Sequence, residues 1–155
     1  MYPFILTLHS ILRWVVLVAA IVAVVRALVG WLGKKEWTNL DDRLGIVLSA
    51  SMDLQVLLGI ILYVLLSPLT RTVFQDFGAA MSDGLLRYWS VEHVLLMIVA
   101  LILIHVGRAT SGSAEEATKK HRRAFIFFGL ATLVILIAIP WPFFSYGRPL
   151  LRLGL

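Results

Sequence analysis

The sequence contains no cysteine and few charged residues. None of the 155 residues is Cys, which excludes disulfide bonds, iron–sulfur clusters, thiolate metal sites and haem attached covalently through cysteine. A redox centre in this chain would have to be held by His or Met. Charged residues make up 15% of the chain and hydrophobic residues 60%, against about a quarter and about half in an average soluble domain. This excess of apolar residues over what a small core can bury indicates a membrane protein.

Four long apolar runs divide the chain, at roughly 4–32, 44–69, 88–107 and 124–144. Each is close to or above the ~20 residues that a helix needs to cross about 30 Å of hydrocarbon. A helix satisfies its own backbone hydrogen bonds, which lipid requires. The sequence therefore predicts an all-α fold, a four-transmembrane-helix up-down bundle, as a single membrane domain over 1–155. We expect the segment 71–86 to lie on the membrane surface as a short helix.

The positive charges are concentrated between particular apolar runs. The net charge of +5 could suggest nucleic acid as a partner, but these charges lie in short loops and not along one stripe, so we expect a lipid bilayer and no nucleic acid. Because cytoplasmic loops are the richer in Lys and Arg, both termini are predicted on the non-cytoplasmic side. The segments between the first and second runs and between the third and fourth runs hold eight of these residues: Lys34, Lys35, Arg43, Arg108, Lys119, Lys120, Arg122 and Arg123. The opposite side has four: Arg71, Arg87, Arg148 and Arg152.

Several polar residues interrupt the apolar runs, and an ionisable residue inside a span is a candidate functional residue. At a helical rise of 1.5 Å per residue, His9 and His93 both come out at about 9–12 Å below the non-cytoplasmic surface. Arg13 shares a helix face with His9, because residues four apart are neighbours on a helix. Gly59 on the second run lies at the level of the two histidines, where a missing side chain leaves room for a bulky ligand. Glu92 lies beside His93.

Histidines on the first and third spans suit a b-type haem. In an up-down bundle these helices are diagonal partners, and neutral imidazole is a good iron ligand. We therefore expect His9 and His93 to bind the iron and Arg13 or Arg87 to neutralise a haem propionate. Glu92 or a backbone carbonyl would accept a hydrogen bond from the remaining N–H of a ligand histidine. A buried hydrogen-bond network without haem is the alternative interpretation of the same residues.

His105 and His121 form a second, weaker pair of candidates. His105 lies near the cytoplasmic end of the third span and His121 opens the fourth, so together they could hold a second haem in the cytoplasmic half. However, His93 and His105 are 12 residues apart in the sequence, which rotates them by about 120° around the helix. His121 also lies in the cationic run 119–123, which is typical of a membrane interface.

Four short motifs make the chain similar to a family of small bacterial four-helix membrane proteins generically called cytochrome b. They are Leu8-His9-Ser10-x-x-Arg13-Trp14, Asp53-Leu54-Gln55-x-x-Leu58-Gly59, Arg87-x-Trp89-x-x-Glu92-His93-x-x-x-Met97 and Ile139-Pro140-Trp141-Pro142. The resemblance covers most of the chain, and its motifs include His9 and His93 but neither His105 nor His121. It implies a b-haem electron carrier in the bacterial cytoplasmic (inner) membrane.

From the residues and the resemblance we expect a haem-b protein that passes electrons within the bilayer, with a quinone as a further candidate cofactor. The sequence offers no catalytic residues, so a carrier or a small subunit of a larger membrane redox complex is favoured over a stand-alone enzyme. Two alternatives remain: a haem-free structural or assembly subunit, and a proton or ion transport element using Asp53, Arg13 and Glu92. Against transport, no inverted repeat or broken mid-span helix is visible.

Overall fold

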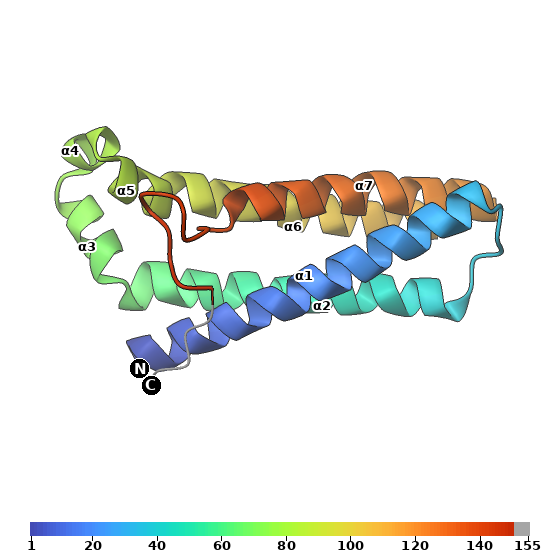
Figure 1. Cartoon of the computed structure of the whole chain (residues 1–155), viewed down its shortest axis with the longest axis horizontal. Helices are drawn as coiled ribbons and strands as arrows, with labels where there is room; N and C mark the ends of the chain where they lie inside the picture. The colour runs from blue at the N-terminus through green and yellow to red at the C-terminus, as the bar shows by residue number, and fades with distance from the viewer. Residues whose placement is uncertain (151–155) are drawn as a thin grey trace.

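The computed structural model describes residues 1–150, and in this range the fold is all-α, as the sequence predicts. Four long helical segments alternate in direction along the bundle (Figure 1). The elements are α1 (Tyr2–Leu32), α2 (Asn39–Ile61) continuing as the π-helical η1 (Leu62–Leu66), α3 (Pro68–Gln75), α4 (Phe77–Ser82), α5 (Gly84–Arg87), the π-helical η2 (Tyr88–Glu92), α6 (His93–Gly112) and α7 (Ala117–Ala138).

Four helical segments are long and apolar enough to cross a membrane: Tyr2–Leu32, Asn39–Leu66, Gly84–Gly112 and Ala117–Ala138. Large apolar side chains such as Val18, Leu57 and Ile137 point outward and are more than half exposed. In water such a surface would be very unfavourable, whereas lipid solvates it. The protein is therefore a multi-pass membrane protein.

The helix limits differ from those expected, for local reasons. The second span begins at residue 39 and not 44, because the Asp41 side chain caps it, accepting from the Thr38 backbone N–H at 2.8 Å and the Thr38 hydroxyl at 2.7 Å. The fourth span runs from 117 to 138 and not from 124 to 144. Pro140 follows it, and a proline disfavours the helical conformation at the residue before it.

Helices α1 and α6 are diagonal partners, as an up-down bundle requires. Helix α1 packs against α2 and α7, and α6 packs against α7 and α2. The most extensive pairing is α6 with α7, where a Cβ added to Gly107 would lie 2.6 Å from the Cβ of Phe127. Small residues allow this close approach of helices in a membrane. Alanines of α1 and α7 make the same kind of contact in the buried core: Ala20, Ala23, Ala27, Ala124 and Ala131.

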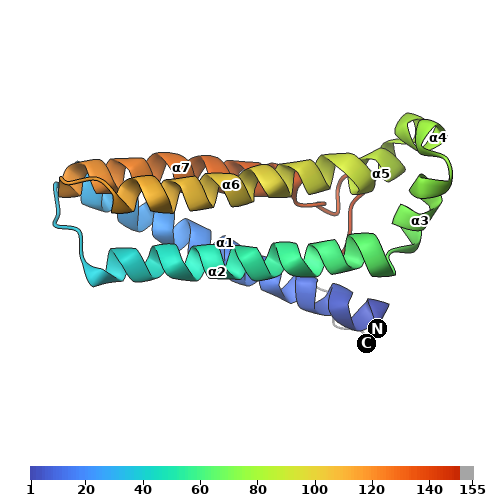
Figure 2. The ribbon, with the colours of Figure 1, turned by 180° about the vertical axis from the view of Figure 1, so that it is seen from behind.

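The bundle opens at the end that carries the N-terminus. There α1 diverges from α7, and the short helices α3 and α4 fold over the ends of α2 and α6 (Figures 1 and 2). Chain segment 139–150 turns back from α7 towards α1, where the carbonyl oxygen of Leu150 accepts hydrogen bonds from Arg13 and, at 3.0 Å, from Trp14 Nε1. The two π-helical segments face each other here, since Tyr63 in η1 donates to the carbonyl of Ser90 in η2 at 2.9 Å. Such π-helical segments often occur at functional sites.

Candidate functional site

A cavity of about 210 Å³ lies inside the open end of the bundle. Its walls come from α1, α2 with η1, η2 with α6, the end of α7 and segment 139–150. Most lining side chains are apolar, and His9, Arg13, Gln55, His93 and Arg148 are the strongly polar ones. A mostly apolar cavity with a few convergent polar groups is typical of a small-molecule or cofactor site.

His93, at the start of α6, is held by a single well-placed hydrogen bond. Its Nδ1 lies 2.8 Å from the carbonyl oxygen of Ala138 on α7. A carbonyl can only accept, so Nδ1 carries the hydrogen and Nε2 keeps its lone pair. Metal-binding histidines typically have this arrangement, in which one ring nitrogen donates to a carbonyl and the other is available as the ligand.

The Ala138 carbonyl is available because α7 ends at a proline pair. In a continuing helix it would accept from the N–H of residue 142, but that residue is Pro142 and has no N–H. His93 and the Tyr88 hydroxyl, the latter at 2.7 Å, both donate to it instead. The Leu136 carbonyl, whose helical partner would be Pro140, accepts from Trp141 Nε1 at 2.9 Å in the same way. The motif 139–142 thus positions His93 from another helix.

His9 lies across the cavity on α1 and contacts Gln55 of α2. The Gln55 side-chain amide donates to the His9 carbonyl oxygen at 3.1 Å and lies 3.3 Å from His9 Nε2. Because the Gln55 nitrogen is the donor, His9 Nε2 accepts and Nδ1 carries the hydrogen. Gly59, one turn further along α2, makes room for this ring, since an added Cβ would lie 3.4 Å from His9 Cε1.

Unpaired polar atoms concentrate on the cavity wall. Buried polar groups are nearly always hydrogen-bonded, and exceptions call for an explanation. Within residues 1–150, five buried side-chain polar atoms lack a partner, and four of them belong to cavity residues: His9 Nδ1, Arg13 Nε, Gln55 Oε1 and Trp89 Nε1. The fifth is His121 Nδ1. Four of these five atoms thus belong to residues that line one cavity.

Two arginines give the cavity a positive rim. Arg13 on α1 donates to the Leu150 carbonyl and leaves its Nε unpaired. Arg148 lies over the Trp89 ring, 5.1 Å from its centroid, and its backbone N–H donates to the Pro140 carbonyl at 3.0 Å. These cations are suited to carboxylate or phosphate groups of a bound molecule.

Glu92 is not among the residues that line the cavity. Its carboxylate pairs with Arg87 Nε at 2.8 Å, and both side chains are more than two-fifths exposed. The sequence predicts that either a carboxylate or a backbone carbonyl accepts from the His93 N–H. In the structure the acceptor is the backbone carbonyl of Ala138.

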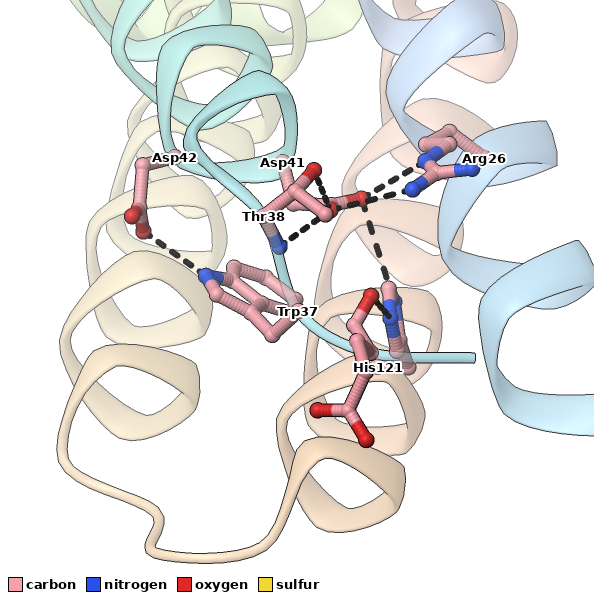
Figure 3. Close-up of polar contacts among 7 residues, drawn as sticks. Arg26, Trp37, Thr38, Asp41, Asp42 and His121 are labelled. Atoms are coloured by element: carbon pink, nitrogen blue, oxygen red, sulfur yellow. Dashed lines mark hydrogen bonds and ion pairs between the residues drawn. The ribbon is translucent and has the colours of Figure 1, made fainter. Parts of the chain in front are cut away.

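His105 and His121 have separate partners and lie outside the cavity lining. His105 Nε2 is 2.7 Å from Asp53 Oδ1, between α6 and α2. His121 is fully buried near the opposite end of the bundle, with Nε2 3.4 Å from the Glu36 carbonyl and Nδ1 4.0 Å from Asp41 Oδ1 (Figure 3). The structure therefore does not bring these two histidines together around one ligand.

The surroundings of His121 form a polar cluster that joins three helices (Figure 3). Arg26 of α1 donates from Nε to Asp41 of α2 at 2.8 Å, and the Trp37 ring lies 4.9 Å from the His121 ring of α7, centroid to centroid. A Cβ added to Gly30 would lie 2.3 Å from His121, so that glycine is required for the packing. These contacts give His121 a role in helix packing.

Comparison of the chain with protein-family models, curated protein sequences and solved structures gave no significant match. Within the described residues no group of three or more His, Cys, Asp or Glu side chains could hold a bare metal ion. A haem needs fewer protein ligands, because the porphyrin supplies four nitrogens and the protein one or two axial ligands.

Sequence reasoning missed two contributors to the cavity. The Ala138 carbonyl could have been found from the two prolines after α7, which free carbonyls at fixed positions. The role of Arg148 had no sequence signal, because it depends on how segment 139–150 folds back over Trp89.

Proposed function

We propose that the cavity between α1 and α6 binds a b-type haem through His93 and His9, and that the protein is a membrane electron carrier. The observation that carries the proposal is His93, whose Nδ1–H is held by the Ala138 carbonyl so that Nε2 is available as a ligand. His9 lines the same cavity from the diagonal helix.

The cavity residues fit a haem in three respects. The apolar lining suits a porphyrin ring, the arginines at positions 13 and 148 suit its two carboxylates, and the lining residues include four with an unpaired buried polar atom. When bound, a haem with two imidazole ligands would supply an iron centre that exchanges one electron with little rearrangement.

The protein residues have distinct roles in this proposal. His93 binds in a fixed tautomer, since the Ala138 carbonyl keeps the hydrogen on Nδ1. Gln55 must release His9 Nε2 if that nitrogen is to bind iron, because the two atoms are now 3.3 Å apart. Segment 139–150 covers the cavity from the membrane surface, with Arg148 and Pro149 in its lining.

The biological setting follows from the same proposal. The apolar outer faces of the four spans would contact lipid or the other subunits of a redox complex. The end with the loops 33–38 and 113–116 carries the eight positive residues named above, which favours that end as cytoplasmic and the N-terminal end as periplasmic. A bacterial cytoplasmic membrane is proposed on the resemblance described above.

The test is a dithionite-reduced minus oxidised spectrum of the protein purified in mild detergent from cells with adequate haem supply. We expect Soret and α bands in the wild type and their loss in both His9→Ala and His93→Ala. His105→Ala is the matched control, a histidine outside the cavity, and should keep the bands. A spectrum without bands in the wild type would leave the haem-free structural subunit as the explanation of the buried polar residues.

A further inference from the structure

Asp53 and His105 form a polar pair on the lipid-facing surface of the bundle. Asp53 Oδ1 lies 2.7 Å from His105 Nε2 and so joins α2 to α6. These two helices are nearest the viewer in Figure 2. Asp53 is close to the middle of the span Asn39–Leu66. Its side chain is 51% exposed and that of His105 is 47% exposed, so both groups are open to the hydrocarbon.

The pair has two unused hydrogen-bonding atoms. An uncompensated charge is costly in hydrocarbon, so the stable forms are net neutral: imidazolium with carboxylate, or imidazole with carboxylic acid. In both forms His105 Nδ1 carries a hydrogen, and Asp53 Oδ2 keeps free lone pairs. The contact between the two side chains uses His105 Nε2 and Asp53 Oδ1. Within residues 1–150, His105 Nδ1 and Asp53 Oδ2 have no hydrogen-bond partner.

The neighbouring side chains leave this pair accessible. Ala50 on α2 and Ala109 on α6 lie one turn away and are small and exposed. The large exposed neighbours are the aliphatic Leu57 and Ile102. The exposed, cationic Arg108 lies one turn from His105 on α6, with Nη1 3.5 Å from Ser49 Oγ of α2. The pair therefore presents one donor and one acceptor beside aliphatic side chains, with the cationic Arg108 one turn further along α6.

We propose that the Asp53–His105 pair binds the headgroup of a lipid-soluble quinone. The oxidised quinone would accept from His105 Nδ1–H through a ring carbonyl, whereas the reduced quinol would donate a ring hydroxyl to Asp53 Oδ2. In both forms an isoprenoid or alkyl tail would lie along the aliphatic faces of α2 and α6. A single polar point suits one small headgroup, whereas a packed partner helix would need a longer complementary surface. The site is separate from the cavity and does not depend on haem.

Helix α2 would link the two sites. Gln55, two residues from Asp53, faces the cavity and contacts His9, while Asp53 faces the lipid. A quinone at the pair would therefore lie against the outer surface of a helix that forms the cavity wall.

The test uses a short-tailed azidoquinone with a clickable tag, photolysed with the purified full-length protein in lipid nanodiscs. We expect labelled peptides from 46–57 and 102–109, with labelling competed by an unlabelled short-tailed quinone. His105→Gln removes the donor to the ring carbonyl, and Asp53→Asn removes the carboxylate that holds the His105 ring in place. Each should lower the labelling by about tenfold, equivalent to about 1.4 kcal/mol. Thr110→Val is the matched control, because its lipid-side hydroxyl bonds within its own helix to the Val106 carbonyl at 2.7 Å.

Three results would overturn the proposal: labelling confined to the cavity-lining segments 2–16 and 135–149, equal labelling of the wild type and both pair variants, or a changed oligomeric mass in the variants without a change in labelling. The last would make the pair a subunit contact. The map of labelled peptides in the wild-type protein tests the proposal even where a variant fails to fold. A His105→Gln protein that loses quinone labelling but keeps its Soret band would separate this proposal from the haem proposal.

Discussion

His93 of α6 donates its Nδ1 hydrogen to the carbonyl oxygen of Ala138, the last residue of α7, across 2.8 Å. The bond exists because residue 142 is a proline and cannot supply the N–H that a longer helix would offer. The end of α7 therefore fixes the orientation of His93, a candidate ligand on α6.

The proline pair gives a prediction about the reduction potential of the proposed haem. In a Pro140→Ala/Pro142→Ala double variant α7 can continue, and the N–H of residue 142 would compete with His93 for the Ala138 carbonyl. A ligand histidine that loses this bond is a weaker donor and stabilises ferric iron less. We expect a higher midpoint potential in potentiometric titration.

The single variant Pro142→Ala is the control for that experiment. Pro140 still keeps Ile139 out of the helical conformation, so the midpoint should stay at the wild-type value. Equal midpoints in the double variant and the wild type would show that the His93–Ala138 bond does not tune the centre.

Gly59 offers a test of the His9 side of the cavity. An alanine there would place its Cβ 3.4 Å from His9 Cε1, whereas the same change at Gly129 in α7 meets nothing within 4 Å. Gly129→Ala should raise the free energy of unfolding by about 0.5–1 kcal/mol through helix propensity alone. Gly59→Ala should gain less stability and lower the haem content, measured as Soret absorbance per protein. Equal haem content in the two variants would argue against His9 as a ligand.

The fold could be predicted from the sequence because span length and apolar content act locally. Every predicted span is present, and two of them end just before a proline, at Leu66 before Pro68 and at Ala138 before Pro140. The limits were less accurate, since the cap at Asp41 starts α2 five residues before the predicted 44, a shift of about 7.5 Å along the helix axis.

The candidate site could be predicted only in part. His9, His93, Arg13 and Gly59 were found from depth and facing, and all line the cavity. Glu92 was expected beside the ligand and instead pairs with Arg87. The contact of Asp53 with His105 depends on how α2 and α6 rotate against each other, which tertiary packing decides. The hydrogen bond of Arg13 to Leu150 joins residues far apart in the chain, and no local pattern encodes it.

Two adjacent aspartates at the start of α2 should differ strongly in their effect on stability. Asp41 has a buried side chain that accepts from Arg26 Nε at 2.8 Å and caps the helix, while Asp42 is exposed and accepts only from Trp37 Nε1 at 2.9 Å. Asp41→Ala leaves the Arg26 guanidinium without its partner and should cost about 3 kcal/mol. Asp42→Ala should cost about 1 kcal/mol or less.

Unfolding in mixed micelles of increasing SDS content, followed by circular dichroism, measures both aspartate variants under one condition. Similar losses for the two would mean that the cluster around Arg26 and His121 contributes little to holding α1, α2 and α7 together.

The haem content of the wild-type protein tests the central claim most directly. Protein purified in mild detergent, from cells with adequate haem supply, is assayed for haem by the pyridine haemochrome spectrum and for chain by amino-acid analysis. The account predicts one b-type haem per chain, since His9 and His93 line one cavity while His105 and His121 have other partners. Protein without haem under these conditions would contradict it.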